Sequence, residues 1–300
     1  PSGSVSDPYP TTFQEHYNGD LKFLAIGDWG LKGPATGQSQ VASAMATWSK
    51  NIKFVLNLGD SFYQTSNSTA PTVLDANDHE GVSTETDSKW KSYWLDVYGD
   101  NLADVTWYTV VGNHDWYNNV TAEVDYFWDI DSRFFLPSLY FVRKVEFGSG
   151  LTAVADADWI FVVGHHPLVG DCRLKNTHYY LMYKLVPYLE KHKVAVYFSG
   201  HSHELAISLK NSSSLITYFC SGAGGATLDS VGCLSSDWTS TSSLTFGFLS
   251  IHIPADGKTL HYDFVSANSS QVIYSGTVNS RKSNNGTGSR NNDNGHGKGS

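Results

Sequence analysis

The chain contains few cysteines, no basic segment outside its last residues and no long apolar run. Its three cysteines, Cys172, Cys220 and Cys233, exclude a disulfide framework, because they can form at most one pair and leave one thiol over. A formal net charge of -9 makes nucleic acid an unexpected partner. No stretch approaches the roughly 20 consecutive apolar residues that span a bilayer, so we expect no transmembrane helix.

Two polar ends flank a segment that can form a large core. Residues 1–20 are polar with three prolines and predict an irregular leader. Residues 280–300 predict a disordered tail, because residues 281–300 carry no apolar side chain. Residues 21–279 are then expected to form one folded domain, and a hydrophobic content of 40% is enough for its core.

Potential N-glycosylation sites indicate passage through the secretory pathway. Five Asn-x-Ser/Thr sequons occur, at Asn67, Asn119, Asn211, Asn268 and Asn285. They predict a glycoprotein of the secretory pathway that is secreted, lysosomal or vacuolar, or luminal at the cell surface. The sequence shows no secretory leader, so we expect any such leader to have been removed.

Strands and helices alternate along the first two thirds of the chain. Apolar runs that predict strands lie at residues 21–26, 53–58, 105–111, 159–163 and 194–198, with helical patterns between most of them. This alternation predicts an α/β fold with a largely parallel sheet covered on both faces. Later runs without a helical pattern, at residues 215–219, 244–253, 259–265 and 271–278, predict antiparallel strands in a second sheet packed beside the first.

Each of the five early strands ends at a polar residue that can bind a metal ion, and these are Asp28, Asp60, Asn113, His165 and His201. Ligands of open α/β sheets gather outside the carboxyl ends of strands, so we expect these side chains on one rim. Tyr63 and His203 extend the set to seven donors. Seven donors are too many for one ion, whereas two ions that share Asp60 would each take four, and two-metal sites commonly hydrolyse phosphate esters.

Each motif also has a simpler interpretation. Gly59-Asp60 is typical of an ordinary turn after a strand, even though Tyr63 follows three residues later. His165 alone fits a hydrogen-bonded core histidine, and His201 with His203 fits a solvated turn. The occurrence of all five motifs at strand ends favours a metal site, where carboxylate and phenol oxygens suit a hard trivalent ion.

The ordered motifs closely resemble the five sequence blocks of the purple acid phosphatases, within the calcineurin-like metallophosphoesterases. The blocks stand here at Gly27–Gly30, Gly59–Tyr63, Gly112–Asp115, Val162–His165 and Gly200–His203, and the resemblance spans about residues 21–265. It implies a four-layer αββα sandwich with a dinuclear metal centre at strand ends. It also implies an acid phosphatase of the small, tartrate-resistant type, which hydrolyses phosphate monoesters with a metal-bound hydroxide as nucleophile.

The resemblance further assigns a role to each site residue. By this resemblance Fe3+ is held by Asp28, Asp60, Tyr63 and His203. A divalent iron, zinc or manganese ion is held by Asp60, Asn113, His165 and His201. The Tyr63 phenolate gives the purple colour, His114 is catalytic, and His114 and Asn113 bind the substrate, a small phosphate ester. A monomer is expected.

Three departures from the family pattern leave other functions open. Leu174 stands where the small animal enzymes carry a second substrate-facing histidine, and residues 141–158 are too few for the usual strand and helix. The cysteines do not match the family disulfide, and pairing of Cys220 with Cys233 stays open. One alternative is a non-enzymatic scaffold with protein partners, as in the glideosome-associated membrane anchors that share this fold. Another is a phosphodiesterase or nucleotidase on the same site.

Overall fold

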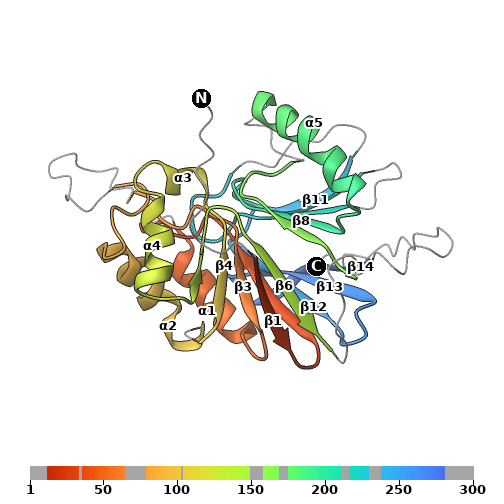
Figure 1. Ribbon diagram of the computed structural model, residues 1–300, viewed down its shortest axis with the longest axis horizontal. Helices are drawn as coiled ribbons and strands as arrows, with labels where there is room; N and C mark the ends of the chain where they lie inside the picture. Colours follow the sequence, from red (N-terminus) through yellow and green to blue (C-terminus); the bar gives the residue numbers. More distant parts are fainter. Residues whose placement is uncertain are drawn as a thin grey trace.

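In the described part of the chain, two large sheets and a small two-stranded one are combined with six helical segments. Figure 1 shows their arrangement. The computed structural model describes residues 12–33, 36–64, 79–102, 104–148, 158–168, 175–210, 216–229 and 238–280. The helical segments are α1 (Gln38–Trp48), the π-helical η1 (Trp90–Leu95), α2 (Asp96–Leu102), α3 (Asn113–Trp116), α4 (Thr121–Asp129) and α5 (Lys175–Lys191).

The larger sheet has seven strands in the order β14-β13-β12-β2-β3-β4-β5. Its strands are β2 (Leu21–Ile26), β3 (Phe54–Asn57), β4 (Thr106–Thr109), β5 (Phe134–Phe135), β12 (Gly247–Ile253), β13 (Thr259–Ser266) and β14 (Gln271–Asn279). β2 to β5 pair in parallel, whereas β12, β13 and β14 are antiparallel to their neighbours. The sheet is therefore mixed, with its parallel part built from the first half of the chain.

The second sheet has five strands in the order β11-β9-β10-β8-β7. They are β7 (Phe161–Val163), β8 (Val196–Ser199), β9 (Leu205–Lys210), β10 (Thr217–Ser221) and β11 (Trp238–Ser243). A separate parallel pair joins β1 (Thr12–Tyr17) to β6 (Val142–Phe147).

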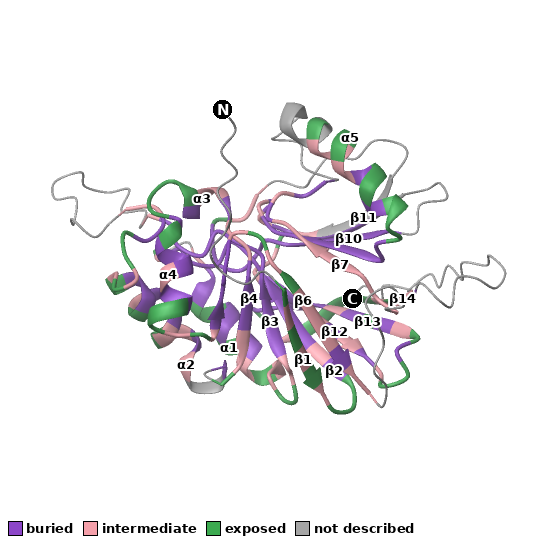
Figure 2. Ribbon diagram, in the orientation of Figure 1, coloured by how far each residue is buried: buried purple, intermediate pink, exposed green. Residues whose placement is uncertain are grey.

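Three hydrophobic clusters separate four layers, which are helices, sheet, sheet and α5 (Figures 1 and 2). Neighbouring residues of β2 face opposite sides: Leu24 packs toward α1, whereas Phe23 packs against Phe198 of β8 between the sheets. Leu189 of α5 packs with Tyr197 in the outer cluster. The expected αββα sandwich is thus confirmed, and both faces of β2 and β3 are buried.

The allocation of strands to sheets differs from the sequence prediction. β7 and β8 belong to the second sheet rather than to the sheet of β2, β3 and β4, and β12 to β14 extend the first sheet. Apolar periodicity identifies a strand but not its hydrogen-bonding partner, which is why the pattern left this open. Within the expected irregular leader, residues 12–17 form β1, whose half-buried side chains depend on pairing with β6. The first helix begins at Gln38 with Gly37 as its N-cap.

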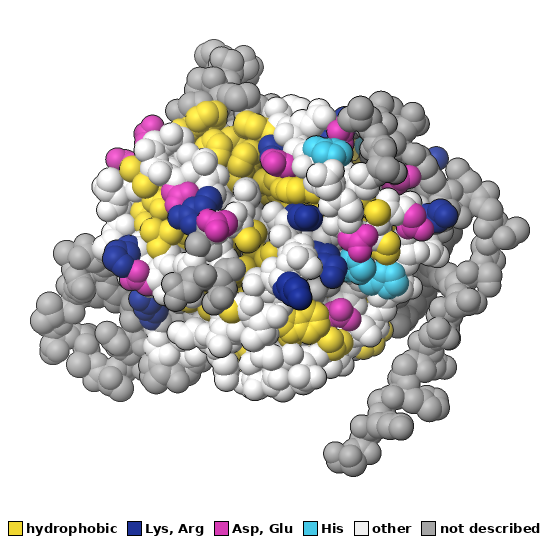
Figure 3. All heavy atoms as spheres, turned by 90° about the horizontal axis from the view of Figure 1, so that it is seen from below, with side chains coloured by type: hydrophobic (Ala, Val, Ile, Leu, Met, Phe, Trp, Pro, Cys, Tyr) yellow, Lys and Arg dark blue, Asp and Glu magenta, His cyan; other side chains and the backbone are white. Residues whose placement is uncertain are grey.

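Several expectations concern residues outside the described part of the chain. These are Asn67, Asn211, Asn285, Cys172, Leu174, Cys233 and the tail at 281–300. Cys220 is described, and it is a buried free thiol whose Sγ donates to the carbonyl oxygens of Gly200 and Ser202. Among the described helices, none is long and apolar enough to cross a bilayer. On the face in Figure 3, basic side chains are interspersed with acidic ones.

Candidate metal centre

The carboxyl ends of strands from both sheets converge on one site. Asp28 follows β2, Asp60 follows β3, and His201 follows β8. All three have a left-handed backbone, with φ of 58°, 53° and 66° respectively. Residues other than glycine rarely adopt this conformation, which costs about 1–3 kcal/mol each and concentrates at functional sites. The three residues that carry these side chains therefore have a strained backbone where the strands end.

Glycines in the motifs make room for the two carboxylates. A Cβ atom at Gly112 would lie 2.2 Å from the Oδ1 atom of Asp60, and one at Gly200 would lie 2.4 Å from the Oδ2 atom of Asp28. Both approaches are closer than nonbonded atoms allow, so any side chain at either glycine would displace a carboxylate. The glycines of the Gly-Asn-His-Asp and Gly-His-x-His motifs are thereby explained.

One group of donors surrounds the hydroxyl of Tyr63. This hydroxyl lies 3.0 Å from the Oδ1 atom of Asp28 and 3.0 Å from the Oδ2 atom of Asp60. The Nε2 atom of His203 lies 3.1 Å from the same hydroxyl and 3.3 Å from the Oδ1 atom of Asp28. These are the four side chains that the family resemblance assigns to the trivalent ion.

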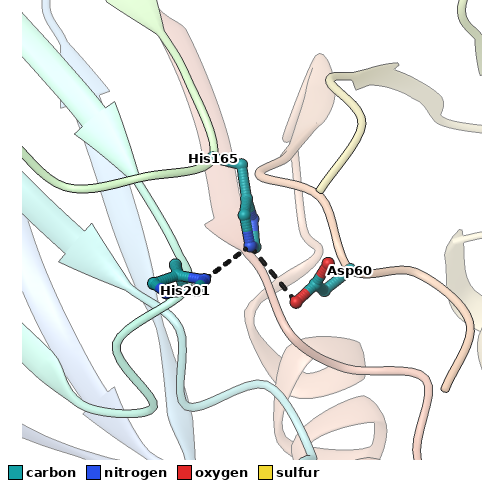
Figure 4. Close-up of side chains that lie close together, drawn as sticks. All are labelled: Asp60, His165 and His201. Atoms are coloured by element: carbon teal, nitrogen blue, oxygen red, sulfur yellow. Dashed lines mark hydrogen bonds and ion pairs between the residues drawn. The ribbon is translucent and has the colours of Figure 1, made fainter. Parts of the chain in front are cut away.

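A second group adjoins the first through Asp60 (Figure 4). The Nε2 atom of His165 lies 3.2 Å from the Oδ2 atom of Asp60 and 3.2 Å from the Nδ1 atom of His201. That Nδ1 atom is also 2.9 Å from the Oδ1 atom of Asn113. The ligand atoms of Asp60, His165 and His201 all lie within 4.8 Å of one another, which is a spacing that one metal ion can bridge. Asp60 thus contacts both groups, and all seven predicted donors lie together.

Outer contacts fix the orientation of the donors. The Nδ1 atom of His165 lies 2.8 Å from the carbonyl oxygen of Leu58, and that of His203 lies 2.6 Å from the carbonyl oxygen of Thr227. Metal-binding histidines commonly use their second ring nitrogen in this way. The Asp229 carboxylate also accepts a 2.7 Å hydrogen bond from the His203 backbone. Sequence reasoning missed Asp229, since no motif marks it.

Asp115, the last residue of the Gly-Asn-His-Asp motif, holds the loop of Asp60. Its buried carboxylate accepts hydrogen bonds from the backbone N–H groups of Asp60, Ser61 and Gly112 at 2.9, 2.9 and 2.7 Å. Asp115 therefore positions the loop that carries Asp60. Asn113 and His114 of the same motif are the predicted metal donor and the histidine expected to face the substrate.

The electrostatics of the site favour a bound cation. Burial alone lowers the pKa of His165 and His203, but the neighbouring carboxylates outweigh it and raise each pKa to about 9. Burial, with the charges of Asp28 and Asp60, raises the pKa of Tyr63 well above its usual value. The two buried carboxylates thus attract positive charge into the site. A bound metal ion would provide that positive charge and would lower the pKa of Tyr63 again. The donor set therefore fits metal ions.

His114 lies beside the donor cluster. Its backbone N–H donates to the Oδ1 atom of Asp60 at 2.8 Å, and its ring packs on the ring of Tyr63 with centroids 4.2 Å apart. Its Nδ1 atom lies 2.9 Å from the Oε2 atom of Glu80. Burial lowers the pKa of His114, but the contact with Glu80 and the charge of Asp60 outweigh it, so the pKa is raised.

A fold of stacked mixed sheets with these donors at the strand ends defines a metallophosphoesterase. Residues 21–205, more than half of the chain, match the family described as calcineurin-like phosphoesterase, and the chain belongs to this family.

Comparison with curated proteins places acid phosphatases among the relatives. The chain is 28% identical over 236 residues to tartrate-resistant acid phosphatase type 5 of Sus scrofa, a match covering 62% of this chain and 64% of the relative. It is 27% identical over 301 residues to purple acid phosphatase 4 of Arabidopsis thaliana, covering 84% and 82%. The chain thus spans slightly less than two thirds of the length of the pig relative.

Two solved structures share the fold. The structure described as GAP50, the anchor in the inner membrane complex of Plasmodium, superposes with a TM-score of 0.66 at 21% identity, covering 88% of this chain and 90% of that one. Purple acid phosphatase PPD1 from yellow lupin seeds superposes with a TM-score of 0.59 at 15% identity, covering 91% and 55%. At these identities the similarity supports the fold alone.

Proposed function

We propose that this chain is an acid phosphatase that hydrolyses phosphate monoesters at a dinuclear Fe3+–M2+ centre, where M is iron, zinc or manganese. The observation that carries the proposal is the position of Asp60, whose Oδ2 atom lies 3.0 Å from Tyr63 and 3.2 Å from His165, one residue from each donor group. Asp28, Tyr63 and His203 would complete the Fe3+ site, and Asn113, His165 and His201 the divalent site. The acid phosphatases among the relatives support the same reaction.

The residues of the chain would divide the remaining work. The two bound ions would neutralise charge on the phosphate and lower the pKa of the attacking water. Asn113 and His114 would contact the phosphate group. The contact with Glu80 favours a protonated His114 imidazole, which could stabilise the phosphate charge or protonate the leaving oxygen.

Hydrolysis of p-nitrophenyl phosphate in mildly acidic buffer tests this proposal. The purified protein is loaded with Fe3+ and Zn2+, and metal content is measured on the same sample. Turnover, with little activity on bis(p-nitrophenyl) phosphate, is the expected result. Inactivity of protein that carries both metals refutes the proposal, and preference for the diester favours the phosphodiesterase alternative instead.

A non-enzymatic anchor is the second candidate function. The likeness to the Plasmodium anchor structure, which covers 88% of this chain, favours it through the fold. A complete donor set is more than an anchor needs, and for that reason we place it second. Fully metal-loaded protein that lacks activity but pulls a stable partner from native membranes would favour the anchor.

Passage through the secretory pathway is part of the proposal. Two sequon asparagines lie in the described part of the chain, Asn119 and Asn268, and both are exposed, as glycosylation requires. Digestion of the native protein with an N-glycosidase should increase its gel mobility, and unchanged mobility would count against glycosylation.

A further inference from the structure

A carboxylate from outside the family motifs contacts the histidine of the candidate site. The Oε2 atom of Glu80 lies 2.9 Å from the Nδ1 atom of His114, a residue 34 positions away in the sequence. The same oxygen accepts a 3.0 Å hydrogen bond from the backbone N–H of Gln64, next to Tyr63. A carboxylate only accepts, so the proton in the first contact belongs to the Nδ1 atom of His114.

The loop that carries Glu80 is attached to the segment that carries the metal donors. The backbone N–H of Gly81 donates to the carbonyl oxygen of Phe62 at 2.8 Å. The ammonium group of Lys89, a residue only 2% exposed, donates to the carbonyl oxygens of Tyr63 and Gly81, both at 3.1 Å, and also to that of His79. Glu80 is therefore held in a fixed position relative to Tyr63.

We propose that Glu80 is a positioning residue, which holds the His114 imidazole with its proton on Nδ1 and its Nε2 atom free for the substrate. The aromatic rings of Tyr63 and Tyr117, with centroids 4.2 and 5.3 Å from that of His114, limit the remaining motion of the imidazole. This inference rests on the proposed phosphatase function for its catalytic consequence, although the ring orientation itself does not depend on turnover.

The consequence concerns the leaving group. With Nδ1 held by Glu80, Nε2 is the ring atom that can pass a proton to the leaving oxygen as the ester P–O bond breaks and a water-derived oxygen bonds to phosphorus. The neutral imidazole that remains still donates from Nδ1 to Glu80, and it regains its Nε2 proton from solvent. A basic alkoxide needs that proton, whereas p-nitrophenolate leaves without it, so Glu80 should matter most for alkyl phosphates.

Nuclear magnetic resonance of histidine tests the orientation without turnover. Isotope-labelled protein is loaded with Zn2+ alone, which is diamagnetic, and His114→Gln identifies the His114 signals among the 12 histidines. We expect a strongly deshielded, slowly exchanging Nδ1 proton that becomes less deshielded and exchanges faster in Glu80→Gln, whose neutral amide oxygen accepts a weaker hydrogen bond. The control is Asp20→Asn, which neutralises the carboxylate of a similar pair, Asp20 Oδ2 to His252 Nε2 at 2.9 Å, away from the site. An unchanged His114 signal in Glu80→Gln overturns the proposal.

Kinetics of the same variants test the catalytic consequence. Glu80→Gln should lower kcat for glycerol 2-phosphate about 10-fold or more and that for p-nitrophenyl phosphate less than about 3-fold, since proton transfer typically contributes 100- to 10,000-fold. KM and metal content should stay unchanged. Equal loss for both substrates, or loss of metal, overturns the proposal in favour of a merely structural role. An inactive wild type with the expected His114 signal refutes the phosphatase function and supports the orientation.

Discussion

Replacing Asp60 by Asn should remove both metal ions at once, because the variant keeps the shape of the side chain but loses its charge. Two unit charges about 4 Å apart interact by about 4 kcal/mol at an effective dielectric constant near 20. The Oδ2 atom of Asp60 lies 3.0 Å from the hydroxyl of Tyr63 and 3.2 Å from the Nε2 atom of His165, so an ion held between either pair of atoms would lie within this distance. Each affinity should fall about 1,000-fold or more, since about 1.4 kcal/mol is a factor of ten.

Elemental analysis of metal per chain measures this effect. Two one-sided variants are the controls: Asp28→Asn should weaken chiefly the trivalent site and Asn113→Ala chiefly the divalent site. We expect near-zero occupancy of both metals in Asp60→Asn and partial loss in each control. Two metals retained in Asp60→Asn would refute the shared role of this carboxylate.

Three further predictions use single substitutions. Tyr63→Phe should abolish the visible absorption of the iron-loaded protein while leaving the fold intact, because only the phenol oxygen is lost. His114→Ala should keep both metals but lower kcat by about 100- to 10,000-fold, as expected for a lost proton donor. Glu123→Gln should stabilise the metal-free protein progressively as pH rises, because burial raises the pKa of Glu123 well above its usual value. The folded state keeps a proton that the unfolded chain releases, so its stability falls by about 1.4 kcal/mol per pH unit between the two pKa values.

Spectra, metal-normalised kinetics and thermal unfolding at several pH values check these three outcomes. A visible band that survives in Tyr63→Phe would exclude the tyrosine ligand. Metal loss in His114→Ala would assign that histidine a binding role. A pH-independent difference between Glu123→Gln and the wild type would show that Glu123 does not hold a proton in the fold.

The sequence placed the candidate donors at strand ends but did not assign the strands to their sheets. Asp28 and Asp60 follow abruptly after apolar runs, and this local pattern was enough to place them at strand ends. The pattern did not separate β8, which ends before His201, from the sheet of β2, because the pairing of strands depends on contacts distant in sequence. The site therefore forms where two sheets meet, although the prediction placed its strands in one.

Residues that orient the donors were mostly invisible in the sequence. Glu80 lies in a polar segment without periodicity, and only the folded loop brings it to His114. Asp229 likewise reaches His203 from a segment that follows β10. The pairing of β1 with β6 joins segments about 130 residues apart, and neither segment shows a strong apolar pattern of its own. Such contacts arise from tertiary structure, which a single sequence does not encode locally.

The dinuclear centre itself is the central claim, and anomalous X-ray scattering tests it most directly. Crystals of the protein loaded with Fe3+ and Zn2+ would be measured at both absorption edges. The proposal predicts an iron peak beside Tyr63 and His203 and a zinc peak beside His165 and His201, about 3.5–4 Å apart on either side of the Asp60 carboxylate. A single peak, or two peaks that do not both contact Asp60, would contradict it.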